Sequence, residues 1–166
     1  MTPSFEYRLA NSAETLPIFE LRQALARQTD LLLPAPEEVS ETSTRSMLEH
    51  STAWTFVALD GCHIVALCGM QRGGLQRNAH VARAWIGVLQ QHWGFGIGRR
   101  LFETALAHAT RNGIRRVELT VREDNLRALE LYRGLGFEVE GRRCDALMLG
   151  GKFHDELWLS KRLLTP

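Results

Sequence analysis

The segment from Gln90 to Phe102, QQHWGFGIGRRLF, places three glycines within five positions immediately before a helical pattern. Glycine adopts positive φ at little steric cost and lets a ligand approach the main chain closely, because no Cβ intervenes. Amide groups at the start of a helix also carry the positive end of the helix dipole, so they attract phosphate groups. The segment therefore predicts a turn that binds a phosphate or pyrophosphate through main-chain amides.

Two common phosphate-binding motifs do not fit these glycines. A P-loop needs Lys and then Ser or Thr after its last glycine, but Arg99 and Arg100 follow Gly98. A dinucleotide fingerprint needs Gly or Ala where, in the two possible frames, Arg99 and Leu101 stand. The remaining candidate ligand is the pyrophosphate arm of coenzyme A.

Strands and helices are expected around this turn. Asp60-Gly61 joins two apolar runs and predicts an antiparallel hairpin. Alternation of apolar and polar residues, or short apolar runs, predicts strands over 4–10, 53–59, 62–71, 80–89, 115–121, 137–144 and 152–163. Helical spacing predicts helices from an N-cap at Ser12 to about 27, over 40–49, from the glycines to about 113, and from a cap at Asp124 or Asn125 to about 134.

The glycine turn resembles the signature of the GNAT superfamily, the acetyl-CoA-dependent N-acetyltransferases. That signature is Arg or Gln, two residues, Gly, one residue, and Gly or Ala, between a strand and a helix. Gln91, Gly94 and Gly96 match every letter. We prefer the register Trp93, Gly96 and Gly98, because it places the last glycine directly before the helix, although Trp93 then stands where the family has Arg or Gln.

Further segments extend the resemblance from about Trp54 to Leu163. VELTVREDN resembles the family's next strand and cap, NLRALELYRGLGF its signature helix, and GKFHDELWLSKRL its closing strand. The carboxy half is most similar to bacterial amino-acid N-acetyltransferases. The resemblance implies a GNAT-like α/β (α+β) fold with a mixed, mostly antiparallel central sheet of about seven strands, flanked by about four helices. We expect residues 1–166 to form a single acetyltransferase domain.

The resemblance also implies which residues bind acetyl-CoA, the acyl donor. In the family, pantetheine pairs with one strand like an added strand, two parallel strands splay to admit it, and the thioester carbonyl lies beside a backbone amide, here near Val88. The pyrophosphate is held by main-chain amides, and an asparagine contacts the cofactor. The implied cofactor residues are Ile86, Gly87, Val88, Phe95, Gly96, Ile97, Gly98, Arg99, Asn125 and Tyr132.

Tyr132 is the candidate general acid. It lies seven residues after Asn125, almost two helical turns, so both side chains project from one face of a helix. A phenol with a pKa of about 10 is protonated at neutral pH and can give its proton to the departing thiolate. The flanking pattern from Asn125 to Phe137 favours this role over simple packing.

Several groups are candidates for the general base. Some family members carry a glutamate where Thr120 stands. Glu118 shares the face of Thr120 and is the candidate catalytic carboxylate, acting through water. His80, His154 or water alone are the alternatives. An α-amine with a pKa near 8 costs only about 1 kcal/mol to deprotonate at pH 7, against about 4.6 kcal/mol for a lysine amine.

The acceptor is therefore expected to be a small primary amine such as an amino acid. The amine attacks the thioester directly, and no nucleophilic residue is needed. A protein N-terminus is the second candidate acceptor. A non-catalytic module that binds coenzyme A is the alternative from another functional class.

Composition limits the possible partners. The formal charge of +1 predicts no nucleic-acid partner, and we expect no leader and no membrane partner, because the first residues lack a basic and then apolar pattern and no apolar run is long enough for a membrane helix. Cys62, Cys68 and Cys144 suggest neither a disulfide framework nor a zinc site, no metal is expected, and a cytoplasmic location fits best. A homodimer is possible. Trp54, Trp85 and Trp158 are expected in the core, and the leucines at 31–33 either border the acceptor pocket or pack.

Overall fold

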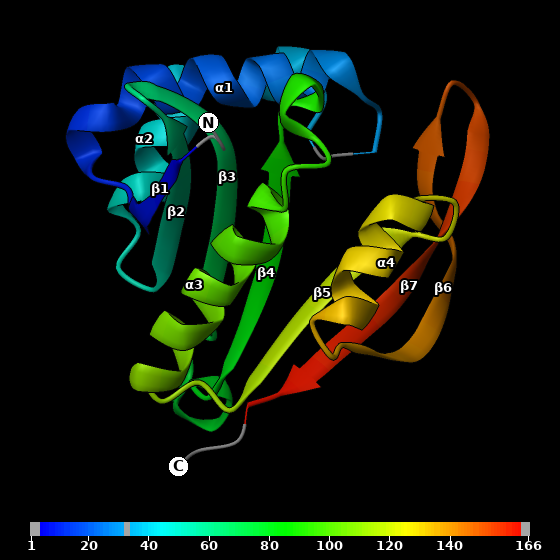
Figure 1. Cartoon of the computed structure of the whole chain (residues 1–166). Helices are drawn as coiled ribbons and strands as arrows, with labels where there is room; N and C mark the ends of the chain where they lie inside the picture. Colours follow the sequence, from blue (N-terminus) through cyan, green and yellow to red (C-terminus); the bar gives the residue numbers. More distant parts are fainter. Residues whose placement is uncertain (1–3, 32–33, 164–166) are drawn as a thin grey trace. The chain divides into compact units, whose positions relative to one another are not determined.

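The structure is a computed structural model that describes residues 4–31 and 34–163 (Figure 1). Its strands and α-helices are β1 (Phe5–Leu9), α1 (Thr15–Gln28), α2 (Glu41–Glu49), β2 (Ala53–Asp60), β3 (His63–Arg72), β4 (Val81–Val88), α3 (Ile97–Arg111), β5 (Arg116–Arg122), α4 (Leu126–Gly134), β6 (Glu138–Leu149) and β7 (Lys152–Arg162). Every predicted strand and helix is present, with bounds that shift by a few residues.

The strands form one sheet in the order β1-β2-β3-β4-β5-β7-β6. β4 pairs with β5 in parallel, whereas β1 with β2, β2 with β3, β5 with β7, and β6 with β7 pair antiparallel. The parallel register joins 81–83 to 116–118. The predicted mixed, mostly antiparallel sheet of seven strands with four helices is thus confirmed for the described part of the chain.

The chain divides into two compact units. The first consists of Met1–Gln71 and Trp85–His108, and the second of Arg72–Ala84 and Ala109–Pro166. β4 contributes its first half to the second unit and its second half to the first. The expected organisation as a single domain stays a prediction.

In the first unit, the two faces of β2 pack against different helices. Residues that alternate along a strand point to opposite faces. On one face, α1 builds a buried apolar cluster with β2 and β3, made of Ile18, Leu21, Leu25, Val57, Leu59 and Leu67. On the other face, the ring of His108 in α3 lies 5.1 Å from that of Trp54 and 5.3 Å from that of Phe56. The core therefore fixes α1 and α3 on opposite sides of the strands.

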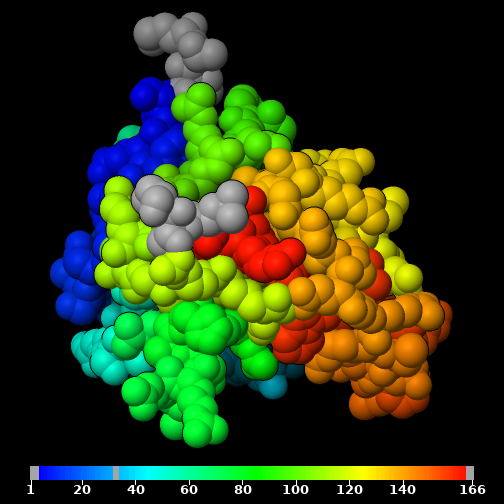
Figure 2. Space-filling model, turned by 90° about the horizontal axis from the view of Figure 1, so that it is seen from below, coloured from blue at the N-terminus to red at the C-terminus, as the bar shows by residue number. Residues whose placement is uncertain are grey.

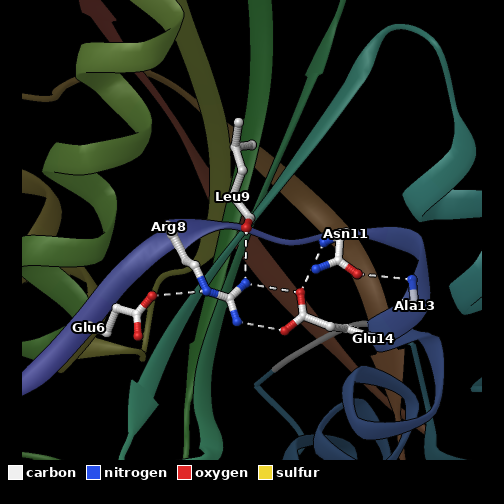
Figure 3. Close-up of polar contacts among 6 residues, drawn as sticks. All are labelled: Glu6, Arg8, Leu9, Asn11, Ala13 and Glu14. Carbon is white, nitrogen blue, oxygen red and sulfur yellow. Dashed lines mark hydrogen bonds and ion pairs between the residues drawn. The ribbon is translucent and has the colours of Figure 1, made fainter.

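Polar contacts fix the link between β1 and α1 (Figure 3). The Arg8 guanidinium donates to both carboxylate oxygens of Glu14, at 3.0 and 2.7 Å. Asn11 accepts from the amide of Ala13 at 3.0 Å, and its own amide donates to Glu14 at 2.9 Å. The predicted cap at Ser12 is wrong: Asn11 caps a short 3-10 turn (Ser12–Glu14), and α1 begins only after it.

In the second unit, β6 and β7 lie side by side as a long hairpin (Figures 1 and 2, orange and red). β6 extends five residues beyond the predicted end at Cys144, because Leu147 to Leu149 continue the pairing with β7. The helix α4 begins after Asn125, whose Oδ1 accepts from the amide of Ala128 at 3.2 Å. Asn125 is therefore the cap among the two predicted candidates.

The expected core position of Trp85 is wrong. Its side chain is 37% exposed, while Trp54 and Trp158 are half-buried. The leucines at 31–33 are expected either to border the acceptor pocket or to pack in the core. Residues 32 and 33 of this segment lie outside the described residues. In the described part of the chain, no helix has the length and apolarity needed to cross a bilayer, and no cluster of three His, Cys, Asp or Glu side chains could hold a metal ion.

Candidate active site

The glycine turn between β4 and α3 has the backbone conformation that the sequence predicts. Gly94 and Gly96 have φ of 86° and 74°, a region that residues with a Cβ rarely adopt. The amide of Arg100 donates to the carbonyl of Gly96 at 3.1 Å, so Gly96 is the N-cap of α3. A glycine offers no side-chain oxygen to cap the helix. The amides of Ile97 and Gly98, in the first turn, are thus placed to bind an anion.

The start of α3 corrects one detail of the sequence reasoning. The preferred register of the motif predicts Gly98 directly before the helix, but α3 begins at Ile97, whose side chain is 1% exposed. Gly98 is the second residue of the helix. The residue directly before the helix is Gly96, which both possible registers of the motif share.

The end of β4 is held by a set of hydrogen bonds that sequence reasoning missed. The carbonyl of Val88 accepts from Gln28 Nε2 at 3.1 Å and from Trp93 Nε1 at 2.8 Å. Gln28 Oε1 in turn accepts from the amide of Gln90 at 2.9 Å. Gln28, the last residue of α1, thereby fixes the peptide groups on both sides of Leu89. Trp93, which stands at the motif's Arg or Gln position, uses its indole N–H within the protein.

The strand residues before this point are mostly buried. Ile86 and Gly87 are buried, and Val88 is half-buried. The amide of Leu89 pairs with the carbonyl of Val65 at 3.0 Å. The residues expected to pair with pantetheine therefore belong to a strand segment whose far end is fixed in place.

The side chains around the glycine turn contact other parts of the first unit. Phe95 is 54% exposed and its ring lies 6.3 Å from that of Phe5. The guanidinium of Arg99 lies 3.3 Å from the carboxylate of Glu103, one helical turn later. The expected contribution of Phe95 and Arg99 to cofactor binding is through their amides, which these side-chain contacts leave unchanged.

In the second unit, Asn125 and Tyr132 are both parts of α4's structure. Asn125 caps the helix through Oδ1, so its amide nitrogen is the group that can donate to a ligand. Tyr132 is 5% exposed, and its ring lies 5.8 Å from that of Phe137. The side chain thus has an apolar environment at one edge, as a buried tyrosine usually does.

Glu118 is part of an ionic cluster on β5. Its Oε1 accepts from Arg116 Nε at 2.6 Å, and Arg116 also pairs with Glu140. Ser160 donates to Glu140 at 2.6 Å. The hydrogen bond from Arg116, with a smaller contribution from Ser160, lowers the pKa of Glu140 to about 2. The carboxylates of Glu140 and Glu118 in turn raise the pKa of Arg116.

The alternative bases occupy different positions. His80 is exposed and precedes the first residue of β4, whereas Val88 is the last residue of that strand. His154 lies on β7 beside a cavity of about 420 Å³ that is also lined by Glu123, Asp124 and Asp155. The predicted cofactor residues from Ile86 to Arg99 lie in the first unit. Glu118, Asn125 and Tyr132 lie in the second.

The model of the acetyltransferase (GNAT) family matches residues 19–137. This chain belongs to the GNAT family. Solved structures of similar fold include a GNAT-family acetyltransferase from Streptococcus pneumoniae, with a TM-score of 0.88, 23% identity, and coverage of 96% of this chain and 100% of that one. The yncA protein of Salmonella typhimurium, solved with its cofactor acetyl-CoA, has a TM-score of 0.88, 17% identity, and coverage of 98% and 96%.

Named relatives of this GNAT chain match over shorter stretches. A mycothiol acetyltransferase of Geodermatophilus obscurus is 32% identical over 110 residues, which is 61% of this chain and 36% of that protein. The N-alpha-acetyltransferase RimI of Mycobacterium tuberculosis is 41% identical over 86 residues, which is 52% of each. This chain therefore spans about half or less of the length of these relatives.

Proposed function

We propose that this chain transfers the acetyl group of acetyl-CoA to the primary amine of a small molecule, such as an amino acid. The observation that carries the proposal is the turn at Gly96. A left-handed glycine caps α3 without a side chain, and the strand that precedes this turn, β4, has its end fixed by hydrogen bonds. Such a turn suits the pyrophosphate of coenzyme A. The yncA protein, which has a similar fold, was solved with acetyl-CoA.

The pyrophosphate accepts hydrogen bonds from the main-chain amides of 95–99, and Asn125 donates to the cofactor through its amide nitrogen. Pantetheine pairs with β4 at Ile86, Gly87 and Val88 as an added strand does. The amide of Val88 then donates to the thioester oxygen as negative charge develops on it. The hydrogen bonds from Gln28 and Trp93 to the Val88 carbonyl support this role, because they fix the strand end on which the amide is carried.

The reaction is a direct transfer. The neutral amine attacks the thioester carbonyl, the new C–N bond forms, and the C–S bond of the resulting intermediate breaks. Tyr132 gives its phenolic proton to the departing thiolate. Glu118 accepts the proton lost by the amine through a water molecule, and the ion pair with Arg116 fixes that carboxylate in place.

The test is release of coenzyme A thiol from acetyl-CoA with a panel of amino acids, polyamines, aminoglycosides and peptides. The proposal expects turnover with one class of small amine. Binding of acetyl-CoA without turnover on any amine would instead show a non-catalytic module. No measurable binding of acetyl-CoA would overturn the proposal altogether.

A protein N-terminus is the second candidate acceptor. It is supported by the similarity to the RimI protein of Mycobacterium tuberculosis. Peptides with a free N-terminus, compared with the same peptides blocked by acetylation, separate this activity from transfer to a free amino acid.

A further inference from the structure

A pocket in the first unit contains one charged side chain among apolar ones. The pocket has a volume of about 240 Å³. Its walls include Leu25, Ala26, Val39, Met47 and Trp85. The charged residue is Arg22 of α1. A cation in an apolar pocket is unfavourable unless a partner compensates its charge.

The protein contacts of Arg22 hold its guanidinium without neutralising it. Nη1 donates to Thr44 Oγ1 at 2.7 Å and lies 3.4 Å from Ser43 Oγ. Both hydroxyls donate their own protons to the carbonyl of Ser40, at 2.8 and 3.0 Å, so they can only accept from Arg22. Ser40 caps α2, which ties the guanidinium to the start of that helix.

No acidic side chain in residues 4–31 and 34–163 forms an ion pair with Arg22. Burial lowers the pKa of Arg22, and no neighbouring carboxylate counteracts this. Both hydrogen bonds to the hydroxyls start from Nη1. These two bonds do not use the edge formed by Nε–H and Nη2. That edge of a guanidinium is planar and can bind a carboxylate through two parallel hydrogen bonds.

Another residue that lines the pocket is Trp85, whose position depends on a glycine. A Cβ at Gly69 would lie 2.4 Å from the indole nitrogen of Trp85 and 2.5 to 2.8 Å from two of its ring carbons. Gly69 is not in the left-handed region, so its lack of a side chain serves to admit the indole. Trp85 thereby presents a partly exposed aromatic surface on β4, three residues before Val88.

We infer that this pocket selects an acceptor that carries a carboxylate together with an apolar side chain, with Arg22 pairing with the carboxylate and Trp85 contacting the apolar group. The place of the pocket in the reaction rests on the proposed function, because the strand that continues from Trp85 is the one expected to hold the thioester. Binding of the carboxylate itself does not depend on acetyl transfer.

The test compares L-phenylalanine and L-leucine with their carboxamides by calorimetry. The unmodified protein should bind the acids about tenfold or more tightly than the amides, since the amides cannot neutralise Arg22. This comparison needs no variant. Equal affinity for acid and amide, or no binding of either acid at roughly 10 mM, would overturn the inference.

Variants assign the preference to Arg22. Arg22→Lys and Arg22→Gln should reduce the preference for the acid to about threefold or less, because neither keeps a two-bond pairing with a carboxylate. Arg45→Gln is the matched control: Arg45 lies in α2, pairs with Glu41 at 3.0 Å and should leave the preference unchanged. A preference that survives both Arg22 variants, measured on folded protein, contradicts the assignment.

Turnover separates the two proposals. A preference for acids in binding, with no thiol release on any amine, would leave the pocket in place and remove the proposed function. Thiol release that is equally fast with L-phenylalanine and with phenethylamine would leave the function in place and remove the carboxylate pocket.

Discussion

The glycine turn in the first unit and the β5–α4 region in the second prepare for a ligand in different ways. At the turn, the candidate binding groups are main-chain amides of 95–99, around an N-cap, Gly96, that has no side chain to bond to them. In the β5–α4 region they are side chains that also have structural roles: Glu118 pairs with Arg116, Asn125 caps α4, and Tyr132 is buried. A main-chain site follows from local conformation, whereas a side-chain site depends on what else each side chain contacts.

The largest effect is expected at the side-chain site. Tyr132→Phe should lower kcat about 100-fold, because the thiolate loses its proton donor, while the Kd for coenzyme A changes little. Thiol-release kinetics and calorimetry measure the two quantities. Tyr7→Phe is the matched control, since Tyr7 is the other tyrosine of the chain and lies on β1. Equal kcat values for the two variants would remove Tyr132 from the mechanism.

A smaller effect is expected at the main-chain site. Gly96→Ala should raise the Kd for coenzyme A about tenfold, because a Cβ disfavours the φ of 74° that positions the amides. Gly61→Ala provides the control for strain. Gly61 has a φ of 58°, lies in the β2–β3 hairpin, and has no atom within 4 Å of the position that a Cβ would occupy. Both variants should lose about 1 kcal/mol of stability, and only the first should lose affinity.

The role of Glu118 should be visible but modest. Glu118→Gln should lower kcat about fivefold near pH 7, because an α-amine with a pKa near 8 is already about one-tenth neutral there. The difference should shrink as pH rises and more of the amine is neutral. Glu140→Gln is the control, since Glu140 pairs with the same Arg116. An identical pH profile for wild type and Glu118→Gln would assign proton removal to water alone.

The smallest effect concerns stability. Arg116 holds the pKa of Glu140 at about 2, below the ordinary 4.5. A carboxylate with a lowered pKa in the folded state stabilises the fold above its ordinary pKa and loses that contribution as pH falls. The unfolding free energy of wild type should therefore exceed that of Glu140→Gln at pH 7, and the difference should disappear between about pH 4.5 and pH 2. Urea denaturation at several pH values measures it, and a constant difference would contradict the pairing.

The sequence predicts what depends on neighbouring residues. Asp60-Gly61 indicates its hairpin, the pair Asp124 and Asn125 a helix cap, which is Asn125, and the glycines their turn, because backbone conformation is set locally. The exact start of α3 is harder to predict, because the residue type alone does not show whether a glycine stands before a helix or within its first turn. Gly98 lies within the first turn.

Contacts between distant residues could not be predicted in this way. Gln28 is 60 residues from Val88, and nothing in its surroundings marks it as a partner of that carbonyl. Trp85 is a large apolar residue in an apolar strand, which suggests a core position, yet it lies on the face opposite the buried Ala84 and Ile86, and its indole beside Gly69 is partly exposed. The pairing of Glu118 with Arg116 is likewise consistent with many arrangements of a charged strand face.

The most direct test follows the amide signals of isotope-labelled protein by NMR during titration with coenzyme A and, separately, with pantetheine, which lacks the pyrophosphate. If the turn binds the pyrophosphate, coenzyme A should shift the amides of Gly96, Ile97 and Gly98 most strongly, and pantetheine should leave them nearly unchanged. Binding of coenzyme A that leaves these three amides unmoved, or equal shifts with pantetheine, would contradict the account.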